Sequence, residues 1–291
     1  MPHHGTARLI VFDSGLGGLT VLRALREAVP EARVTYIADD AYFPYGAKPD
    51  DVLIARLHEV IGSAIAELSP DAVVIACNTA STVGLAALRA ANSVPFIGTV
   101  PAVKPAAMLS QSRLVSVLGT PATVRRDYTR ALIATHGEGC DYTLVGPQKL
   151  ATLAETVMAG EEVSDAAIAE EIAPCFVERD GRRTDVVVLG CTHYPLLIGR
   201  MEKLAPWPVT WLDPAPAIAR RTANVLAELG FVVGVGASRP RGEIRFTSGK
   251  QPPAALGTLL DFCGLEATSP DTSGAAQRPH NLASQNLEQP R

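Results

Sequence analysis

Two segments of this chain share one design: an aspartate, five small or apolar residues and then a cysteine. They are residues 71–77, DAVVIAC, and residues 185–191, DVVVLGC, and each is followed by polar side chains. Residues 8–13 and 113–118 form a second similar pair, and each leads into a turn rich in Gly, Ser or Thr. We interpret the pairs as two related halves and expect a cleft between them. The alternative is a chance resemblance between buried strands.

Short runs of β-branched residues alternate with helical stretches along the chain, which predicts an α/β fold with mainly parallel sheets, one in each of two pseudo-symmetric domains. The runs are continuously apolar, so we expect strands buried on both faces. The expected strands are Leu9–Phe12, Val34–Ala38, Ala72–Ala76, Leu114–Leu118, Tyr142–Val145 and Val186–Leu189. The clearest expected helices are Leu19–Ala28, Asp50–Leu68 and Ser164–Arg179. The expected domains are residues 1–98 plus 210–265 and residues 99–209, and the polar residues 266–291 are expected to form a disordered tail.

The charge balance and the cysteines exclude several classes of protein. A net charge of −4 and a pI near 5.9 argue against a nucleic-acid partner. The sequence contains no run of 18 apolar residues, so it predicts no membrane span. The N-terminus lacks the apolar core of a secretory signal. We therefore expect a cytoplasmic protein with reduced thiols. Its five cysteines are widely spaced and odd in number, which fits neither a disulfide framework nor a zinc site, so no metal is expected.

Cys77 and Cys191 both follow an expected parallel strand, at the sheet edge where ligands bind in α/β proteins. A following helix start would lower the pKa of each thiol. A single such cysteine is as readily a buried small hydrophobe. Two at matching positions instead suggest a racemase, in which two bases act on opposite faces of one α-carbon. Asn78, Thr79, Thr192 and backbone amides would stabilise the developing charge.

His193 would adjust the local charge or exchange a proton with the thiol, or would simply form a hydrogen bond. The turn at residues 13–18, DSGLGG, fits the dinucleotide fingerprint incompletely, because Thr20 stands at the third glycine position. A carboxylate ligand suits this turn better. Asp13 would then face an ammonium group, or would cap the following helix.

Four motifs in order carry a resemblance to a known family: residues 13–18, 44–46 (PYG), 77–81 (CNTAS) and 190–197 (GCTHYPLL). Over residues 7–250 the chain resembles the bacterial glutamate racemases of the aspartate/glutamate racemase family. The resemblance implies two domains with the site between them, no cofactor, a homodimer, and D-glutamate supplied for peptidoglycan synthesis.

By the same resemblance, Cys77 would deprotonate D-glutamate and Cys191 would deprotonate L-glutamate. Asp13 and His193 would assist the thiols, together with an acid for which Glu155 is the candidate. Many members carry Cys-Pro before that acid, whereas this chain has Gly146-Pro147 and a spacing one residue longer. The substrate-binding residues would be Asp13, Ser14, Pro44, Tyr45, Gly46, Asn78, Thr79, Thr120, Thr123, Thr192 and His193.

Three other functions remain open at this point. The substrate could be another acidic amino acid such as aspartate. The chain could bind a small acidic ligand without catalysis. It could also be a thiol hydrolase in which Cys191 is the nucleophile and His193 the base.

Overall fold

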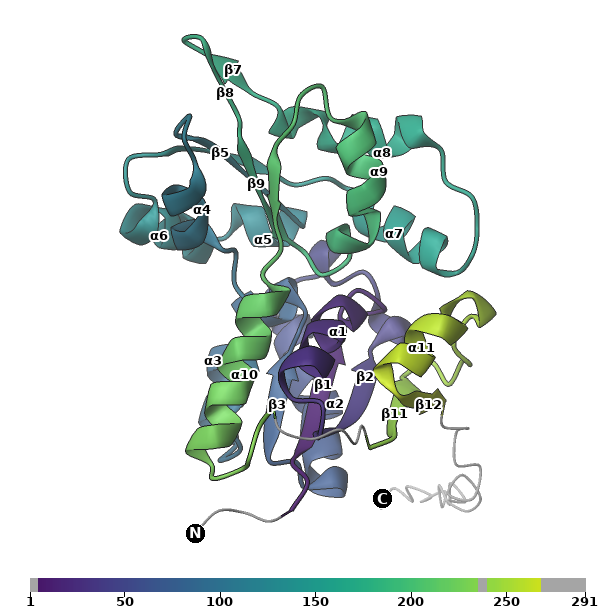
Figure 1. The fold of residues 1–291 in the computed structure, drawn as a ribbon. Helices are drawn as coiled ribbons and strands as arrows, with labels where there is room; N and C mark the ends of the chain where they lie inside the picture. Colours follow the sequence, from purple (N-terminus) through teal and green to yellow (C-terminus); the bar gives the residue numbers. More distant parts are fainter. Residues whose placement is uncertain (1–4, 235–239, 268–291) are drawn as a thin grey trace, which may run out of the picture.

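The computed structural model describes residues 5–234 and 240–267, and in these the chain forms two α/β units stacked one on the other (Figure 1). Each unit contains one parallel sheet with helices beside it, so the expected fold class is confirmed. The expected disordered tail lies outside the described residues from residue 268 onward. Its first two residues, 266 and 267, instead belong to a strand, so the tail was placed too early.

The larger sheet has six strands in the order β12-β11-β2-β1-β3-β4, and all neighbours run parallel. Its strands are β1 Arg8–Asp13, β2 Arg33–Ala38, β3 Ala72–Ile75, β4 Phe96–Gly98, β11 Gly242–Phe246 and β12 Leu265–Ala267. The smaller sheet has the order β10-β9-β5-β6 and is also parallel. Its strands are β5 Leu114–Gly119, β6 Asp141–Val145, β9 Val186–Gly190 and β10 Thr210–Leu212.

The strand orders explain the paired motifs of the sequence. The order β2-β1-β3-β4 in the larger sheet matches the order β6-β5-β9-β10 in the smaller one. The similar segments 8–13 and 113–118 form β1 and β5, which hold the same place in the two sheets. Cys77 lies just past the end of β3 and Cys191 just past the end of β9. The two thiols therefore occupy equivalent positions in two units of related topology.

The chain returns to the larger unit later than the sequence indicated. Strand β10 pairs with β9 of the smaller sheet, in the register Thr210↔Val186. Residues 210–212 therefore belong with the second unit, beyond the expected boundary after residue 209. The return is made by α10 Ala215–Glu228, which packs against α1 Leu19–Ala28 (Figure 1).

The expected helix over residues 164–179 is wrong in its second half. Helix α8 spans Asp165–Ile172, and the short 3-10 turn η3, Ala173–Cys175, follows it. Pro174 ends the helix because it has no N–H to donate and its ring clashes with the preceding helical turn. A hairpin of β7 Glu178–Arg179 and β8 Arg182–Arg183 then turns at Asp-Gly, whose positive φ angles fit a tight turn.

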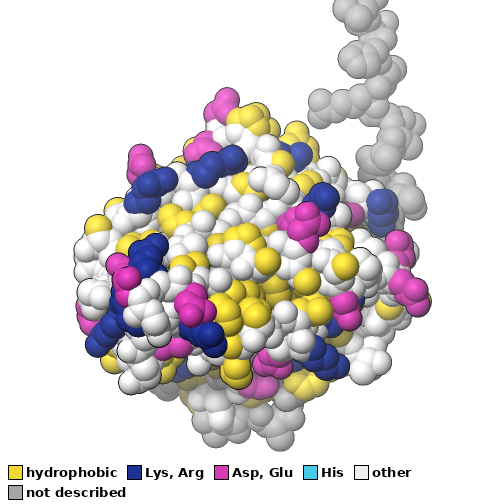
Figure 2. Space-filling view, turned by 90° about the horizontal axis from the view of Figure 1, so that it is seen from above, with side chains coloured by type: hydrophobic (Ala, Val, Ile, Leu, Met, Phe, Trp, Pro, Cys, Tyr) yellow, Lys and Arg dark blue, Asp and Glu magenta, His cyan; other side chains and the backbone are white. Residues whose placement is uncertain are grey.

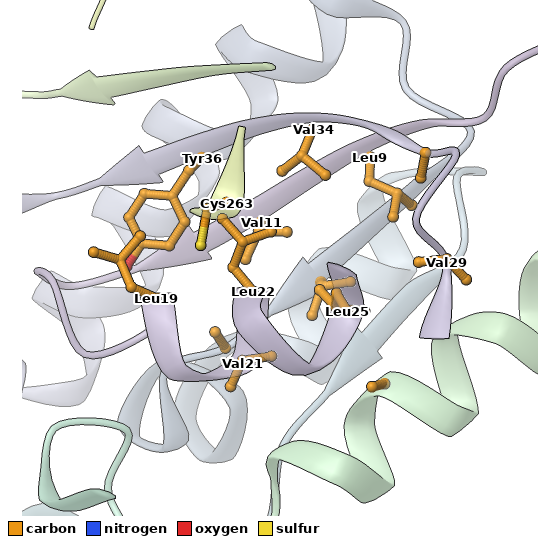
Figure 3. Close-up of a cluster of buried hydrophobic side chains, with 14 of the residues drawn as sticks. Leu9, Val11, Leu19, Val21, Leu22, Leu25, Val29, Val34, Tyr36 and Cys263 are labelled. Carbon is orange, nitrogen blue, oxygen red and sulfur yellow. The ribbon is translucent and has the colours of Figure 1, made fainter. Parts of the chain in front are cut away.

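The core of the larger unit forms on both faces of its sheet. Figure 3 shows Leu9 and Val11 of β1 packed with Leu22 and Leu25 of α1. The alternate residues of β1, such as Phe12, enter a second cluster on the opposite face. That cluster includes side chains from α2 Asp50–Leu68 and α3 Asn78–Ala91. Helix α11 Gly257–Cys263 joins the first face.

The smaller sheet is likewise covered on two faces, with a different set of helices on each. One face packs against α7 Leu150–Met158, α8 and α9 Ile198–Leu204, and the other against α4 Val103–Leu109. Helices α5 Pro121–Arg125 and α6 Asp127–His136 follow β5 in the chain. Burial on both faces is confirmed for the central strands β5 and β9. It is wrong for β6, which lies at the edge of its sheet and is mostly half-exposed.

The surface carries charges of both signs. Figure 2, which looks onto the smaller unit, shows basic and acidic side chains interspersed around apolar ones, without a basic stripe on this face. None of the helices in the described residues is long and apolar enough to cross a membrane.

Candidate active site

The carboxyl ends of strands from both sheets meet at a pocket between the two units. Its lining includes residues within two positions of the ends of β1, β3, β5 and β9. The lining residues are Ser14, Phe43, Pro44, Tyr45, Gly46, Cys77, Asn78, Thr79, Thr120, Ala151, Cys191, Thr192 and His193. The cavity holds about 20 Å³, roughly the room for a single water molecule. The two halves are therefore closed on each other.

Cys77 is buried at the N-terminus of α3. The Ala80 N–H donates to its Sγ at 3.4 Å, and the Sγ forms a second hydrogen bond with Ser14 Oγ at 3.6 Å. Burial and the nearby Asp13 carboxylate nevertheless raise the pKa of Cys77 to about 12, against the lowering effect of these hydrogen bonds. The expectation that the helix start favours a thiolate is wrong here, because desolvation exceeds the effect of the helix end. Cys77 is a protonated thiol at neutral pH.

Cys191 lies beside a histidine that is itself bound to a carboxylate. The Sγ of Cys191 is 3.7 Å from His193 Nδ1, and His193 Nε2 is 2.7 Å from Glu155 Oε1. Burial by itself would lower the pKa of His193, but the hydrogen bonds to Cys191 and Glu155 raise it well above its usual value. A protonated His193 places a positive charge 3.7 Å from the Cys191 sulfur.

The glycine-rich turn after β1 binds a carboxylate, and that carboxylate is the protein's own Glu155. The Leu16 N–H donates to Glu155 Oε1 at 2.6 Å. A Cβ on Gly15 would lie 2.3 Å from the same oxygen, and a Cβ on Gly17 would lie 2.5 Å from His193 Nδ1. The turn is therefore built of glycine because groups of the other unit approach its backbone closely.

Asp13 is fully buried at the end of β1. It accepts hydrogen bonds from the Gly15 N–H and from Thr192 Oγ1, both at 2.9 Å. Burial raises the pKa of Asp13 to about 6, although His193 and both hydrogen bonds act in the opposite direction. The side chain does not cap α1, whose first residue is preceded by Gly18 without a side-chain cap.

Hydroxyl groups join the two units around the pocket. Thr79 Oγ1 lies 3.0 Å from Thr120 Oγ1, which in turn lies 3.0 Å from Thr123 Oγ1. Asn78 is 1% exposed, and within the described part of the chain neither polar atom of its side chain has a partner. A buried amide without partners is costly unless a ligand satisfies it. Asn78 therefore marks the place of a polar ligand group.

Most of the expected site residues lie on the pocket wall, and three stand just behind it. Asp13, Thr123 and Glu155 do not line the cavity, but each bonds to a residue that does. The sequence missed Phe43 and Ala151. Ala151 lies four residues before Glu155 on α7, so helical spacing could have indicated it.

The dinucleotide-binding interpretation of the glycine-rich turn gains no support from this geometry. Asp39, which stands where a ribose-binding acid would, directs its carboxylate to Arg56, Tyr45 and Thr247. Within residues 5–234 and 240–267, no three His, Cys, Asp or Glu side chains group as metal ligands. All five cysteines lie in this part of the chain, and all are free thiols.

The pocket thus presents two thiols, polar groups for an anionic substrate and little room for water. A thiolate can remove an acidic proton and a thiol can deliver one, so the arrangement is suited to proton transfer at a carbon enclosed between the two sulfurs.

Known proteins with similar sequences are enzymes that carry out proton transfer of this kind. The chain is 58% identical to a glutamate racemase of Brucella anthropi over 219 residues, 75% of this chain and 79% of the relative. It is 50% identical to one of Brucella canis over 88% of this chain and 92% of the relative.

The Escherichia coli glutamate racemase, solved with L-glutamate and the activator UDP-MurNAc-Ala, has a similar fold. The TM-score is 0.80 at 34% identity, over 90% of this chain and 97% of that one. The family model for Asp/Glu/hydantoin racemases matches residues 18–222. The protein described here belongs to the Asp/Glu/hydantoin racemase family.

Proposed function

We propose that this protein is a glutamate racemase that interconverts L- and D-glutamate, with Cys77 and Cys191 as the two acid–base groups. The observation that carries the proposal is the pocket itself. Two buried thiols from equivalent strand ends of two related units line one small pocket. The curated relatives with 50% and 58% identity are glutamate racemases, which supports glutamate as the substrate.

The proton balance requires one thiolate and one thiol at the start of each turnover. For L-glutamate, the Cys191 thiolate takes the α-proton, the electron pair stays on the α-carbon as a carbanion, and the Cys77 thiol gives its proton to the opposite face. The reverse direction exchanges these roles. The product is the other enantiomer, and each turnover leaves the two thiols with exchanged protons.

The two thiols lie in different surroundings. The raised pKa of Cys77 keeps its proton ready for delivery. The His193–Glu155 pair places a protonated imidazole beside Cys191, where it can exchange a proton with the sulfur.

The α-proton of an amino acid is a very weak acid, so the site has to stabilise the carbanion. The buried Asn78 amide and the backbone N–H groups near Ser14 and Gly46 can bind the substrate carboxylates. Asp13, next to Ser14 and Thr192, is the nearby carboxylate that can accept a hydrogen bond from the substrate ammonium. Thr120 and Thr123 support this wall through their hydroxyl contacts.

Substrate entry requires the two units to separate. The cavity has room for about one water molecule, much less than glutamate needs. The hydrogen bonds Thr79–Thr120, Thr192–Asp13 and Leu16–Glu155 all cross between the units at the pocket. We infer that these bonds loosen when glutamate enters and that closure then excludes water from the reacting carbon.

The deciding experiment is a racemization assay without added cofactor, starting from L- or D-glutamate in deuterated water. The optical activity should disappear and the product should carry deuterium at the α-carbon. Cys77→Ala and Cys191→Ala should each lower the rate in both directions by about 10²–10⁴-fold or more. Cys140→Ala, a free thiol outside the pocket, is the matched control and should keep full activity.

The same assay separates the other functions. Full activity of either cysteine variant would refute the two-base mechanism. Turnover of aspartate in preference to glutamate would identify a different acidic substrate. Binding without deuterium uptake would indicate a non-catalytic protein, and an acyl-enzyme on Cys191 with Cys77 dispensable would indicate a hydrolase.

The proposed place in peptidoglycan synthesis predicts that cells depleted of this protein recover on D-glutamate. The predicted homodimer can be measured by sedimentation.

A further inference from the structure

A buried carboxylate outside the reaction pocket holds one wall of that pocket in place. Asp39 follows β2 and is 0% exposed. Its Oδ2 accepts from the Tyr45 hydroxyl at 2.5 Å, and its Oδ1 accepts from Thr247 Oγ1 at 2.6 Å and from Arg56 Nη2 at 2.7 Å. Arg56 Nε adds a fourth contact to Oδ2 at 3.0 Å. Both carboxylate oxygens are therefore fully used.

The Asp39 carboxylate is ionised at neutral pH. Burial raises the pKa of Asp39, but the hydrogen bonds from Arg56, Thr247 and Tyr45 lower it by more than burial raises it. The net shift of the pKa is therefore downward. Charge-assisted hydrogen bonds of this kind are about twice as strong as neutral ones. These bonds therefore hold Tyr45, Arg56 and Thr247 in fixed positions around Asp39.

The partners of Asp39 come from separate parts of the larger unit. Tyr45 belongs to the short 3-10 turn η2, which spans Tyr45–Ala47. Arg56 belongs to α2, and Thr247 is the first residue after β11. The Asp39 N–H donates to the Asp13 carbonyl oxygen at 2.9 Å. The cluster therefore fixes η2 relative to the end of β1, where Asp13 stands in the site.

The segment that this cluster holds contributes four consecutive residues, 43–46, to the pocket wall. The Phe43 ring lies 5.4 Å from the His193 ring, centroid to centroid. A Cβ on Gly46 would lie 2.9 Å from Thr120 Cβ, so the backbone of this segment packs directly against the smaller unit. A displacement of the segment would change the pocket at the histidine beside Cys191 and at the contact between the units.

We propose that Asp39 is a positioning residue for the racemization reaction, and that it acts through Tyr45 and Arg56 to fix the pocket wall formed by residues 43–46. This inference rests on the proposed racemase function. Asp39 does not touch the substrate. Its effect is to hold the wall in the geometry that binds glutamate without further ordering, and such preorganisation lowers the cost of binding.

The test is a comparison of KM and kcat for Tyr45→Phe, Asp39→Asn and the double variant. Tyr45→Phe keeps the buried ring and removes one hydrogen bond to a charged group, so KM should rise roughly tenfold for both enantiomers. Asp39→Asn should raise KM by roughly 10- to 100-fold. A merely structural loss would lower the amount of folded enzyme, and thus the apparent kcat, at unchanged KM.

The double variant tests whether Tyr45 acts through Asp39. Its KM should stay well below the product of the two single effects, since Asp39→Asn has already removed the charged acceptor of the Tyr45 hydroxyl. Glu59→Gln is the matched control, because Glu59 is the exposed second partner of Arg56 and its change should leave both constants unchanged. Should Asp39→Asn fail to fold, Thr247→Val together with Tyr45→Phe still decides the question, because each removes one contact to Asp39.

An unchanged KM in the folded Tyr45→Phe and Thr247→Val variants would overturn the inference. So would additive effects of Asp39→Asn and Tyr45→Phe. Failure of the proposed function has a different result: the wild-type protein would then not racemize glutamate at all.

Discussion

Replacing Asp13 by asparagine should make the protein more stable at alkaline pH while lowering its activity. Asp13 is fully buried, and its pKa is raised from 3.8 to about 6. One pKa unit corresponds to about 1.4 kcal/mol, so keeping this carboxylate ionised costs the folded state about 3 kcal/mol at pH 8. Asparagine has nearly the same shape and avoids this cost.

The sign follows from proton binding. The folded state binds the Asp13 proton more tightly than the unfolded state, so the free energy of unfolding falls as the pH rises from about 4 to about 6 and then stays level. From pH 5 to pH 8, the free energy of unfolding of the wild type falls by about 1–2 kcal/mol through Asp13. Asp13→Asn lacks this fall. The bonds from Thr192 and Gly15 to the carboxylate are already part of the net pKa shift of Asp13.

The assay is urea unfolding of both proteins at pH 5 and pH 8, with stability read from the midpoints at a common m-value. The stability difference between variant and wild type should grow by about 1–2 kcal/mol in favour of Asp13→Asn on going to pH 8. Asp51→Asn on α2, an exposed carboxylate, controls for the removal of a negative charge in general. Stability curves of wild type and Asp13→Asn that run parallel with pH would refute the reasoning. The variant should also lose at least roughly tenfold in kcat/KM, because Asp13 stands beside Thr192 in the site.

Two further predictions concern backbone space and thiol protonation. Gly17→Ala should lower kcat/KM by at least roughly tenfold, because its Cβ would lie 2.5 Å from His193 Nδ1. Gly62→Ala, on α2 with nothing within 4 Å of its Cβ, should keep full activity and add about 0.5–1 kcal/mol to the free energy of unfolding. Equal losses of activity in the two glycine variants, measured by steady-state kinetics, would contradict this reading. The pKa of about 12 for Cys77 predicts that kcat/KM from L-glutamate shows no alkaline decline between about pH 7.5 and pH 9, since the thiol keeps the proton that it delivers. L- and D-glutamate have equal free energies, so the profile from D-glutamate should superimpose on it, and a decline centred near pH 8 would show that Cys77 is an ordinary thiol.

The sequence by itself determined the central strands, the related halves and the positions of the two cysteines. Apolar runs such as residues 72–75 and 186–190 are local patterns, and a strand buried on both faces requires them wherever it lies in the sheet. The motifs ending in Cys77 and Cys191 therefore placed both thiols at strand ends before any contact was known. Edge strands such as β6 and short ones such as β10 were misjudged or missed, because little of their surface is buried and their pattern is weak.

Only the tertiary structure decided how the site is charged. Glu155 reaches Leu16 across 139 residues of sequence, and this contact gives a carboxylate to a turn that by itself looked like a ligand site. The protonation of Cys77 and Asp13 depends on burial under the second unit, which exceeds the local effect of a helix end or a turn. Desolvation and charge coupling sum over everything near an atom in space, so a linear pattern cannot contain them. The chain order placed both thiols at equivalent strand ends, and the packing of one unit on the other determined that Cys77 keeps its proton.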